Sequence, residues 1–159
     1  MDSRDFFSPE HEAFRREVRR FIETEIAPYH YQWEADGHFP RELWRRAGEM
    51  GMLCPQVPEV YGGAGADWLY NVVVIEEFAR AGTSGPGSAF LVQSEIVAPY
   101  LMHSGNEDLK RKWLPAMVKG EVIASLGMTE PQAGSDVQAI RTRAVRDGDD
   151  YVINGQKIF

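Results

Sequence analysis

Hydrophobic residues recur at helical spacing over the first three-quarters of the chain. Between Ser8 and Pro28 they follow one another mostly at intervals of three or four positions, with charged residues between them. Ser8 and Pro9 supply an N-cap and a first-turn proline, so an amphipathic helix is predicted from Pro9 to near Pro28. Its other side carries four arginines, Arg15, Arg16, Arg19 and Arg20. Because glutamates alternate with these arginines, we interpret them as a solvated face rather than a binding patch.

Further helices are expected over residues 40–50, 68–81, 88–103 and 106–119. Asp67 can cap the second of these, and a glycine-rich turn over residues 82–87 precedes the third. Pro115 lies within the fourth, where we expect it to break the helix.

The hydrophobic period changes after residue 121. Short runs of strand-forming residues predict strands over 122–126, 142–146, 151–153 and 156–159. Asp147 to Asp150 reads as a turn, and Asn154-Gly155 is typical of a hairpin. Helices followed by antiparallel strands predict the α+β class, with an all-α domain over residues 1–121 that runs into a β domain over residues 122–159.

Composition narrows the class of protein. The 159 residues carry 24 acidic and 17 basic side chains, a net charge of −7, which argues against a nucleic-acid partner. The four histidines lack metal-ligand spacing and Cys54 is the single cysteine, so neither a metal site nor an internal disulfide is expected. An apolar run of about 18 residues and a leader pattern are both missing, so we expect no membrane span.

Residues 126–136, Leu-Gly-Met-Thr-Glu-Pro-Gln-Ala-Gly-Ser-Asp, are the most informative stretch. The small residues let a ligand approach the main chain, and the hydroxyls and N–H groups are uncharged donors. Such a turn suits an anion such as a pyrophosphate, although a plain connecting loop explains the same residues equally well. Gly62-Gly63-Ala64-Gly65 is a weaker candidate, because it lacks a preceding strand and the third glycine of a phosphate loop.

Residues 129–136 resemble the T-E-P-x-A-G-S-D signature of the acyl-CoA dehydrogenase family. Two more motifs stand in the family's order: residues 57–63 are similar to its P-E-x-x-G-G loop, and residues 153–159 to its N-G-x-K-x-[WF] segment. Residues 6–8 and 84–87 look most like the long-chain branch. The resemblance covers essentially the whole chain.

The resemblance implies a truncated acyl-CoA dehydrogenase fold. In this fold an all-α N-terminal helical domain is followed by an antiparallel, β-barrel-like middle domain, and FAD lies between the middle domain and a C-terminal four-helix domain. The chain matches the first domain and the opening third of the second, so we expect the last domain, and with it the catalytic glutamate, to be absent. The chain alone should then be inactive and hold FAD weakly or not at all. Glu130 is interpreted as a structural member of its loop and not as the base.

The family's pattern assigns cofactor-binding roles to Leu126, Met128, Thr129, Gly134, Ser135 and Phe159. It implies that Met128 and Thr129 hydrogen-bond the pyrimidine edge of the flavin, and that Phe159 packs on the flavin. Ser135 is implied to reach both the FAD pyrophosphate and the bound thioester.

Substrate-binding candidates are Ser135, Ala89, Val92 and Ile96, the last three sharing one face of the helix over 88–103. Ordinary core positions explain these three as well. Gln93 departs from the long-chain pattern, which has a small residue there, and this leaves the acyl chain length open.

The implied function is FAD-dependent α,β-dehydrogenation of a medium- to long-chain acyl-CoA thioester in fatty-acid or related acyl-CoA catabolism. Electron-transferring flavoprotein is the implied acceptor and a homotetramer or dimer the implied full-length assembly, in the bacterial cytoplasm or the mitochondrial matrix. Alternatives are an acyl-CoA oxidase or flavin monooxygenase relative of the same fold, or a non-catalytic helical interaction module.

Overall fold

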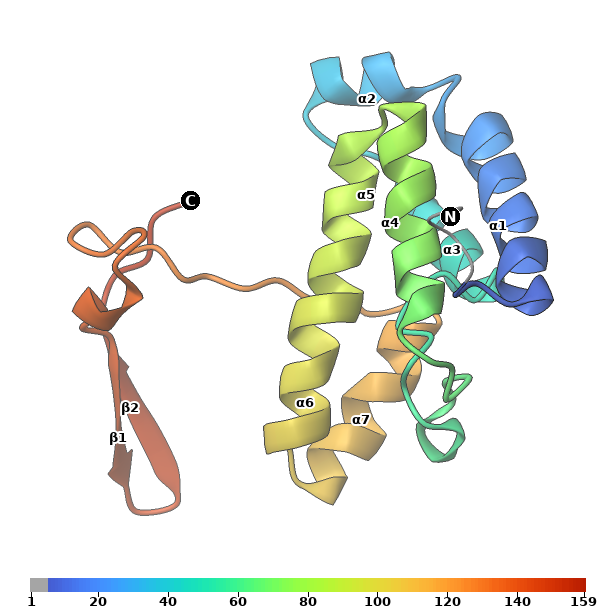
Figure 1. Ribbon diagram of the computed structural model, residues 1–159. Coiled ribbons are helices and arrows are strands. Elements are labelled where there is room, and N and C mark those ends of the chain that lie inside the picture. The colour runs from blue at the N-terminus through green and yellow to red at the C-terminus, as the bar shows by residue number, and fades with distance from the viewer. Residues whose placement is uncertain (1–5) are drawn as a thin grey trace. The chain divides into compact units, whose positions relative to one another are not determined.

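The structure, a computed structural model, describes residues 6–159, which form two compact units. The helical unit extends to Ser125, and the β unit runs from Leu126 to Phe159. Helices followed by an antiparallel pair of strands confirm the predicted α+β class (Figure 1). Among residues 6–159, no helix is both long enough and apolar enough to cross a membrane.

The helical unit is built from α-helices that two π-helical segments extend or join. Its elements are α1 (Pro9–Phe21), η1 (Ile22–Ile26), α2 (His30–Asp36), α3 (Arg41–Glu49), η2 (Glu59–Tyr61), α4 (Leu69–Ala81), α5 (Ser84–Leu91), η3 (Val92–Val97), α6 (Ala98–Ser104) and α7 (Glu107–Val118). The segments η1 and η3 are π-helical, and η2 is a 3-10 turn. The elements α5, η3 and α6 form one long rod, with α4 along its first half and α7 along its second (Figure 1).

Capping residues set the helix starts where the sequence predicts them. The Ser8 hydroxyl accepts the N–H of His11, and the His11 ring accepts the N–H of Ser8, which closes a capping box at the start of α1. An Asp67 carboxylate oxygen accepts the N–H of Leu69 at 2.8 Å at the start of α4. With η1 included, the first helix reaches Ile26, as predicted.

Three helical predictions were wrong in detail. Helix α2 was not predicted, because its seven residues carry little apolar periodicity. The helix expected from residue 88 begins at Ser84, since Pro86 lies in its first turn, where a missing N–H costs nothing. Pro115 does not break α7, and its carbonyl still accepts the N–H of Lys119 at 3.2 Å.

Aromatic residues fill the larger of two apolar clusters in this unit. Phe90 is 1% exposed and meets Trp44 and Phe78 edge-to-face, with ring centroids 4.8 and 5.5 Å away. The smaller cluster brings together α6, α7 and the loop between α3 and α4, and its buried members are Cys54, Val57, Ala98, Leu114 and Met117. Burial raises the pKa of Cys54 to about 12, which supports the interpretation of an unreactive structural thiol.

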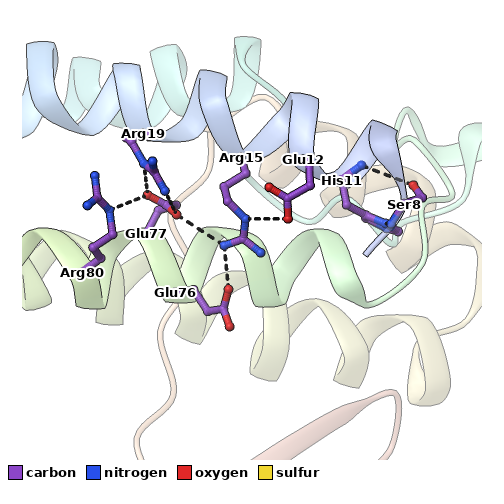
Figure 2. Close-up of polar contacts among 8 residues, drawn as sticks. All are labelled: Ser8, His11, Glu12, Arg15, Arg19, Glu76, Glu77 and Arg80. Carbon is purple, nitrogen blue, oxygen red and sulfur yellow. Dashed lines mark hydrogen bonds and ion pairs between the residues drawn. The ribbon is translucent and has the colours of Figure 1, made fainter. Parts of the chain in front are cut away.

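The prediction of a solvated arginine face on α1 was wrong for Arg15. This side chain is 4% exposed and donates to Glu76 at 2.6 Å and to Glu77 at 3.3 Å, both on α4 (Figure 2). Arg19 donates two hydrogen bonds, of 2.8 and 2.9 Å, to the same Glu77 carboxylate. Burial raises the pKa of Glu77, but hydrogen bonds from Arg19 and Arg15 more than offset this, so that pKa lies below its ordinary value. The arginines therefore tie α1 to α4.

The β unit contains one hairpin, β1 (Arg143–Asp147) and β2 (Asp150–Asn154), paired antiparallel with Val145 opposite Val152. The turn falls at Gly148-Asp149, where Gly148 has a φ of 62°. Both strands are exposed along their whole length. The predicted turn over residues 147–150 and the two strands that flank it are confirmed.

The other two predicted strands and the second hairpin were wrong. Residues 122–126 form no strand, because the N–H of Ala124 donates to the Gln93 side chain at 2.9 Å instead of to a neighbouring strand. Residues 156–159 form no strand either, and Ile158 makes a single main-chain bond there, to Thr129 at 3.0 Å. Gly155 makes no hairpin: a Cβ at this position would lie 2.0 Å from the Thr142 hydroxyl, so glycine lets the chain pass Thr142.

Candidate functional site

A closed turn lies in the middle of the loop over residues 126–136. Glu130 and Ala133 exchange two main-chain hydrogen bonds, of 2.9 and 3.0 Å, around Pro131 and Gln132. Ala133 is buried, whereas the residues on either side of the turn are half-buried or exposed. The turn thus holds two short stretches of accessible main chain, residues 127–129 and 134–136, a few residues apart.

These two stretches carry backbone donors that the chain itself does not use. Among residues 6–159, the N–H groups of residues 127, 128 and 129 find no hydrogen-bond acceptor, and the same holds for residues 134, 135 and 136. In the first stretch, the Met128 carbonyl accepts from the Lys157 ammonium at 2.9 Å, and the Thr129 carbonyl accepts the N–H of Ile158. Main-chain N–H groups without partners can bind an anion or the carbonyl oxygens of a ligand.

The carboxylate of Glu130 is 2% exposed and fully hydrogen-bonded. One oxygen accepts from the Gln132 amide at 2.6 Å and the N–H of Arg141 at 2.7 Å. The other accepts the N–H of Thr142 and the Lys157 ammonium, both at 3.0 Å. Hydrogen bonds from Thr142, from Arg141 and from Lys157 hold the pKa of Glu130 well below its ordinary range. A carboxylate with a lowered pKa and four donors is a poor proton acceptor, and Glu130 is therefore a structural group.

The cofactor candidates of the sequence analysis lie together in the β unit. Met128, Gly134 and Ser135 are exposed, Thr129 is half-buried, and Phe159 projects fully into solvent at the end of the chain. A Cβ added to Gly134 would meet no atom within 4 Å, so the space over this residue is open. Leu126, at the start of the loop, is 42% exposed.

The acyl candidates lie in the helical unit, on the rod formed by α5 and η3. Ala89, Val92 and Ile96 are all half-buried. Ala89 packs against the larger apolar cluster and lines a cavity of about 510 Å³. The cavity is mainly apolar, and its wall includes Trp33, Phe39, Trp44 and Pro86.

Gln93 has a role that the sequence did not indicate. It is fully buried, its amide nitrogen donates to the carbonyl of Met117 at 2.8 Å, and its oxygen accepts the N–H of Ala124. Both polar ends are thus engaged at the end of α7. The side chain fastens α7 and the segment after it to η3.

Glycines in the loop over residues 57–65 are required by close packing. A Cβ on Gly63 would lie 1.9 Å from the carbonyl oxygen of Val57, and Gly62 has a φ of 84°. The N–H of Gly65 also returns to Val57, at 2.9 Å. The Pro-Glu-x-x-Gly-Gly motif therefore closes a compact loop.

Two protein-family models match the chain. Residues 8–121 match the acyl-CoA dehydrogenase N-terminal domain, and residues 125–159 match the acyl-CoA dehydrogenase middle domain. The chain belongs to the acyl-CoA dehydrogenase family.

Individual relatives show how much of a family member's length this chain covers. The long-chain specific acyl-CoA dehydrogenase of Rattus norvegicus mitochondria is 44% identical over 98% of this chain, and the match covers 36% of that relative's length. The acyl-CoA dehydrogenase crystal structure from Geobacillus kaustophilus is 46% identical, with a TM-score of 0.91 over 98% of this chain and 40% of that one. A glutaryl-CoA dehydrogenase from Mycobacterium smegmatis in complex with FADH2 has a TM-score of 0.90 at 31% identity, with the same coverage of both chains. The chain therefore spans a little over one third of the length of its relatives.

Proposed function

We propose that this chain supplies the flavin-facing loop and the acyl-facing helix of an FAD-dependent acyl-CoA dehydrogenase. The observation that carries the proposal is the pair of unpaired N–H stretches around the Glu130–Ala133 turn, in a loop that matches the family's middle domain. FAD offers carbonyl oxygens on its pyrimidine ring and an anionic pyrophosphate, and N–H groups satisfy both without a basic surface. This suits a chain with a net charge of −7.

In this proposal the two stretches contact different parts of the cofactor. Met128 and Thr129 donate to the pyrimidine edge, while Gly134 and Ser135 contact the pyrophosphate. Leu126 and Phe159 pack on the flavin ring, a role that fits their exposed apolar side chains. Ser135 also lies beside the thioester.

When bound, FAD would accept a hydride from the β carbon of the acyl group while a carboxylate removes the α proton. Glu130 does not serve as that carboxylate, since all its lone pairs are bonded. We propose that the base lies in the part of the family's sequence outside the two domains that this chain matches. We further propose that the 159-residue chain alone turns over no acyl-CoA. Dye reduction by the purified chain in the presence of FAD and octanoyl-CoA would contradict this.

Ala89, Val92 and Ile96 are proposed to line the path of the acyl chain. Ala89 lines the cavity of about 510 Å³, whereas Val92 and Ile96 are half-buried on η3, outside the lining of that cavity. Gln93 does not narrow this path, because its amide is engaged by Met117 and Ala124. A substrate of medium to long chain length is therefore proposed.

We propose the domain boundaries, the electron acceptor, the assembly, the process and the location from the resemblance to the family. The chain comprises the N-terminal helical domain over residues 1–121 and the start of the middle domain over residues 122–159. Electron-transferring flavoprotein is the proposed electron acceptor, and the full-length assembly is a homotetramer or dimer. The process is fatty-acid or related acyl-CoA catabolism, in the bacterial cytoplasm or the mitochondrial matrix.

Titration of the ¹⁵N-labelled chain with FAD, followed by NMR, tests the cofactor assignment even when binding is weak. We expect saturable shifts of the N–H signals of residues 127–129 and 134–136. Gly134→Ala adds a methyl group where the chain leaves open space, so it should preserve the fold yet weaken FAD binding by about tenfold. Gly85→Ala is the matched control, because its Cβ also meets nothing and it lies on α5. Shifts elsewhere, or equal affinity of the Gly134→Ala variant, would reject the proposed site.

The same labelled chain tests the acyl path. Dodecanoyl-CoA below its micelle concentration should shift the signals of Ala89, Val92 and Ile96, and butyryl-CoA should leave that of Ala89 unchanged. An Ala89 signal that responds equally to both would reject the preference for longer chains.

A further inference from the structure

Few side chains of the β unit are buried. Among residues 126–159, Glu130 and Ala133 are the buried side chains, and Ala133 is the one apolar member of that pair. Large apolar residues such as Met128, Val145 and Ile153 are exposed. The backbone of residues 126–136 must therefore be fixed by polar contacts.

Those contacts converge on Glu130 from its own turn and from two distant stretches of the chain. Its carboxylate binds the Gln132 side chain, the main chain at residues 141–142, and the ammonium of Lys157. A carboxylate has about four lone-pair positions, and all four are used. The carboxylate thereby joins the turn over residues 130–133, the segment before β1 and the segment after β2.

Lys157 extends the connection to the functional stretch itself. Its ammonium donates to Glu130 at 3.0 Å and also to the carbonyl of Met128 at 2.9 Å. In a planar trans peptide the carbonyl of one residue points opposite to the N–H of the next. A Met128 carbonyl held by Lys157 therefore fixes the direction of the Thr129 N–H, which is one of the donors without a partner.

We propose that Glu130 and Lys157 are positioning residues that hold residues 128–129 in the orientation that presents the Thr129 N–H to a ligand. That the ligand is the flavin rests on the proposed function. The clamp itself, defined as Glu130, Lys157 and their partners at residues 128, 132, 141 and 142, rests on the hydrogen bonds of the free chain. Neither residue touches the reacting atoms in this proposal.

Glu130→Gln is the sharpest variant, because it keeps the shape and removes the charge. A glutamine has one acceptor oxygen, and its NH₂ group would face two donors that the carboxylate now satisfies. Without ligand, amide exchange at Arg141, Thr142 and Ile158 should become at least about tenfold faster. Asp149→Asn removes one negative charge from the exposed turn of the same hairpin and should leave these rates unchanged. Exchange within twofold of the unmodified chain in the Glu130→Gln variant would overturn the clamp.

Lys157→Met tests the link to Thr129. We expect the Thr129 N–H signal of the free chain to move, and FAD affinity in the same titration to fall by about tenfold. Lys157→Arg should restore much of both, and Arg143→Met, which removes a positive charge from exposed β1, should change neither. An unmoved Thr129 signal in Lys157→Met would overturn the positioning role.

The two proposals fail in different ways in these measurements. If the unmodified chain shows no FAD-dependent shift while Glu130→Gln still accelerates exchange and Lys157→Met still moves Thr129, the flavin assignment fails and the clamp stands. If FAD binds and Lys157→Met binds it equally well, the site stands and the positioning role is wrong. The helical-unit signals should be unchanged in every variant, which shows that the helical unit has folded, and the signals of β1 and β2 show the same for the β unit.

Discussion

In the helical unit, side chains such as Phe90 and Val73 are buried, and ion pairs such as Arg15–Glu76 connect helices that also pack together. In the β unit, both strands are exposed along their length, and the buried side chains among residues 126–159 are the Glu130 carboxylate and the Ala133 methyl group. Apolar burial is non-directional and strong in sum, whereas hydrogen bonds fix direction. The helical unit thus supplies stability, and the polar clamp of the β unit supplies the orientation of individual peptide groups.

The largest effect is expected from the aromatic core. Phe90→Ala removes a ring that contacts Trp44 and Phe78, and it should lower the free energy of unfolding of the helical unit by about 3–5 kcal/mol. Urea denaturation followed by circular dichroism measures this loss. Tyr31→Ala, at a residue 83% exposed, is the control and should change the value by less than about 0.5 kcal/mol. A small effect of Phe90→Ala would remove the contrast between the units.

A smaller effect is expected from the ion pairs between α1 and α4. Glu77→Gln weakens the bonds from Arg15 and Arg19 and should cost about 1.5–3 kcal/mol at neutral pH. The pKa of Glu77 is lower in the folded chain than its ordinary value of 4.5, so the unfolded chain binds more protons as the solution is acidified. Its stabilisation is therefore complete above about pH 4.5 and is lost as the pH falls through the folded-state pKa.

Denaturation of both proteins at neutral pH and at pH values well below 4.5 checks that direction. The difference between the unmodified chain and Glu77→Gln should shrink with acidification. A difference that stays constant or grows would show that the Glu77 charge is not the cause.

The buried amide of Gln93 should matter slightly less. Gln93→Leu keeps the volume but leaves the Met117 carbonyl and the Ala124 N–H without this partner, at a cost of about 1–3 kcal/mol. Amide exchange at Ala124 should also accelerate, and a urea titration gives the stability. The exposed Gln32 offers the control, and Gln32→Leu should stay within about 0.5 kcal/mol of the unmodified chain.

The smallest effect on the helical unit is expected from the clamp. Every hydrogen bond of the Glu130 side chain goes to residues 132–157, so Glu130→Gln should change the free energy of unfolding of the helical unit by less than about 0.5 kcal/mol. Helical ellipticity during urea denaturation is the measurement. A change above 1.5 kcal/mol would show that the clamp contributes to the stability of the helices as well.

Local chemistry explains which features could be predicted. The caps at Ser8 and Asp67 and the turn at Gly148-Asp149 involve neighbours within a few residues, so they could be predicted from the sequence. The strand expected over residues 122–126 failed because Ala124 binds a side chain 31 residues away. Arg15 was assigned to solvent because its partners on α4 are 61 and 62 positions distant.

The sequence by itself determined the α+β class, the family and the segment that carries the candidate site, because motif order and hydrophobic period are properties of neighbouring residues. The tertiary structure decided which polar groups are satisfied. It showed that Arg15 and Gln93 connect helices, that the Glu130 carboxylate accepts from four donors, and that the N–H groups of residues 127–129 and 134–136 have no acceptor among residues 6–159. Hydrogen bonding between distant residues depends on distance and direction in space, and only the folded chain fixes these.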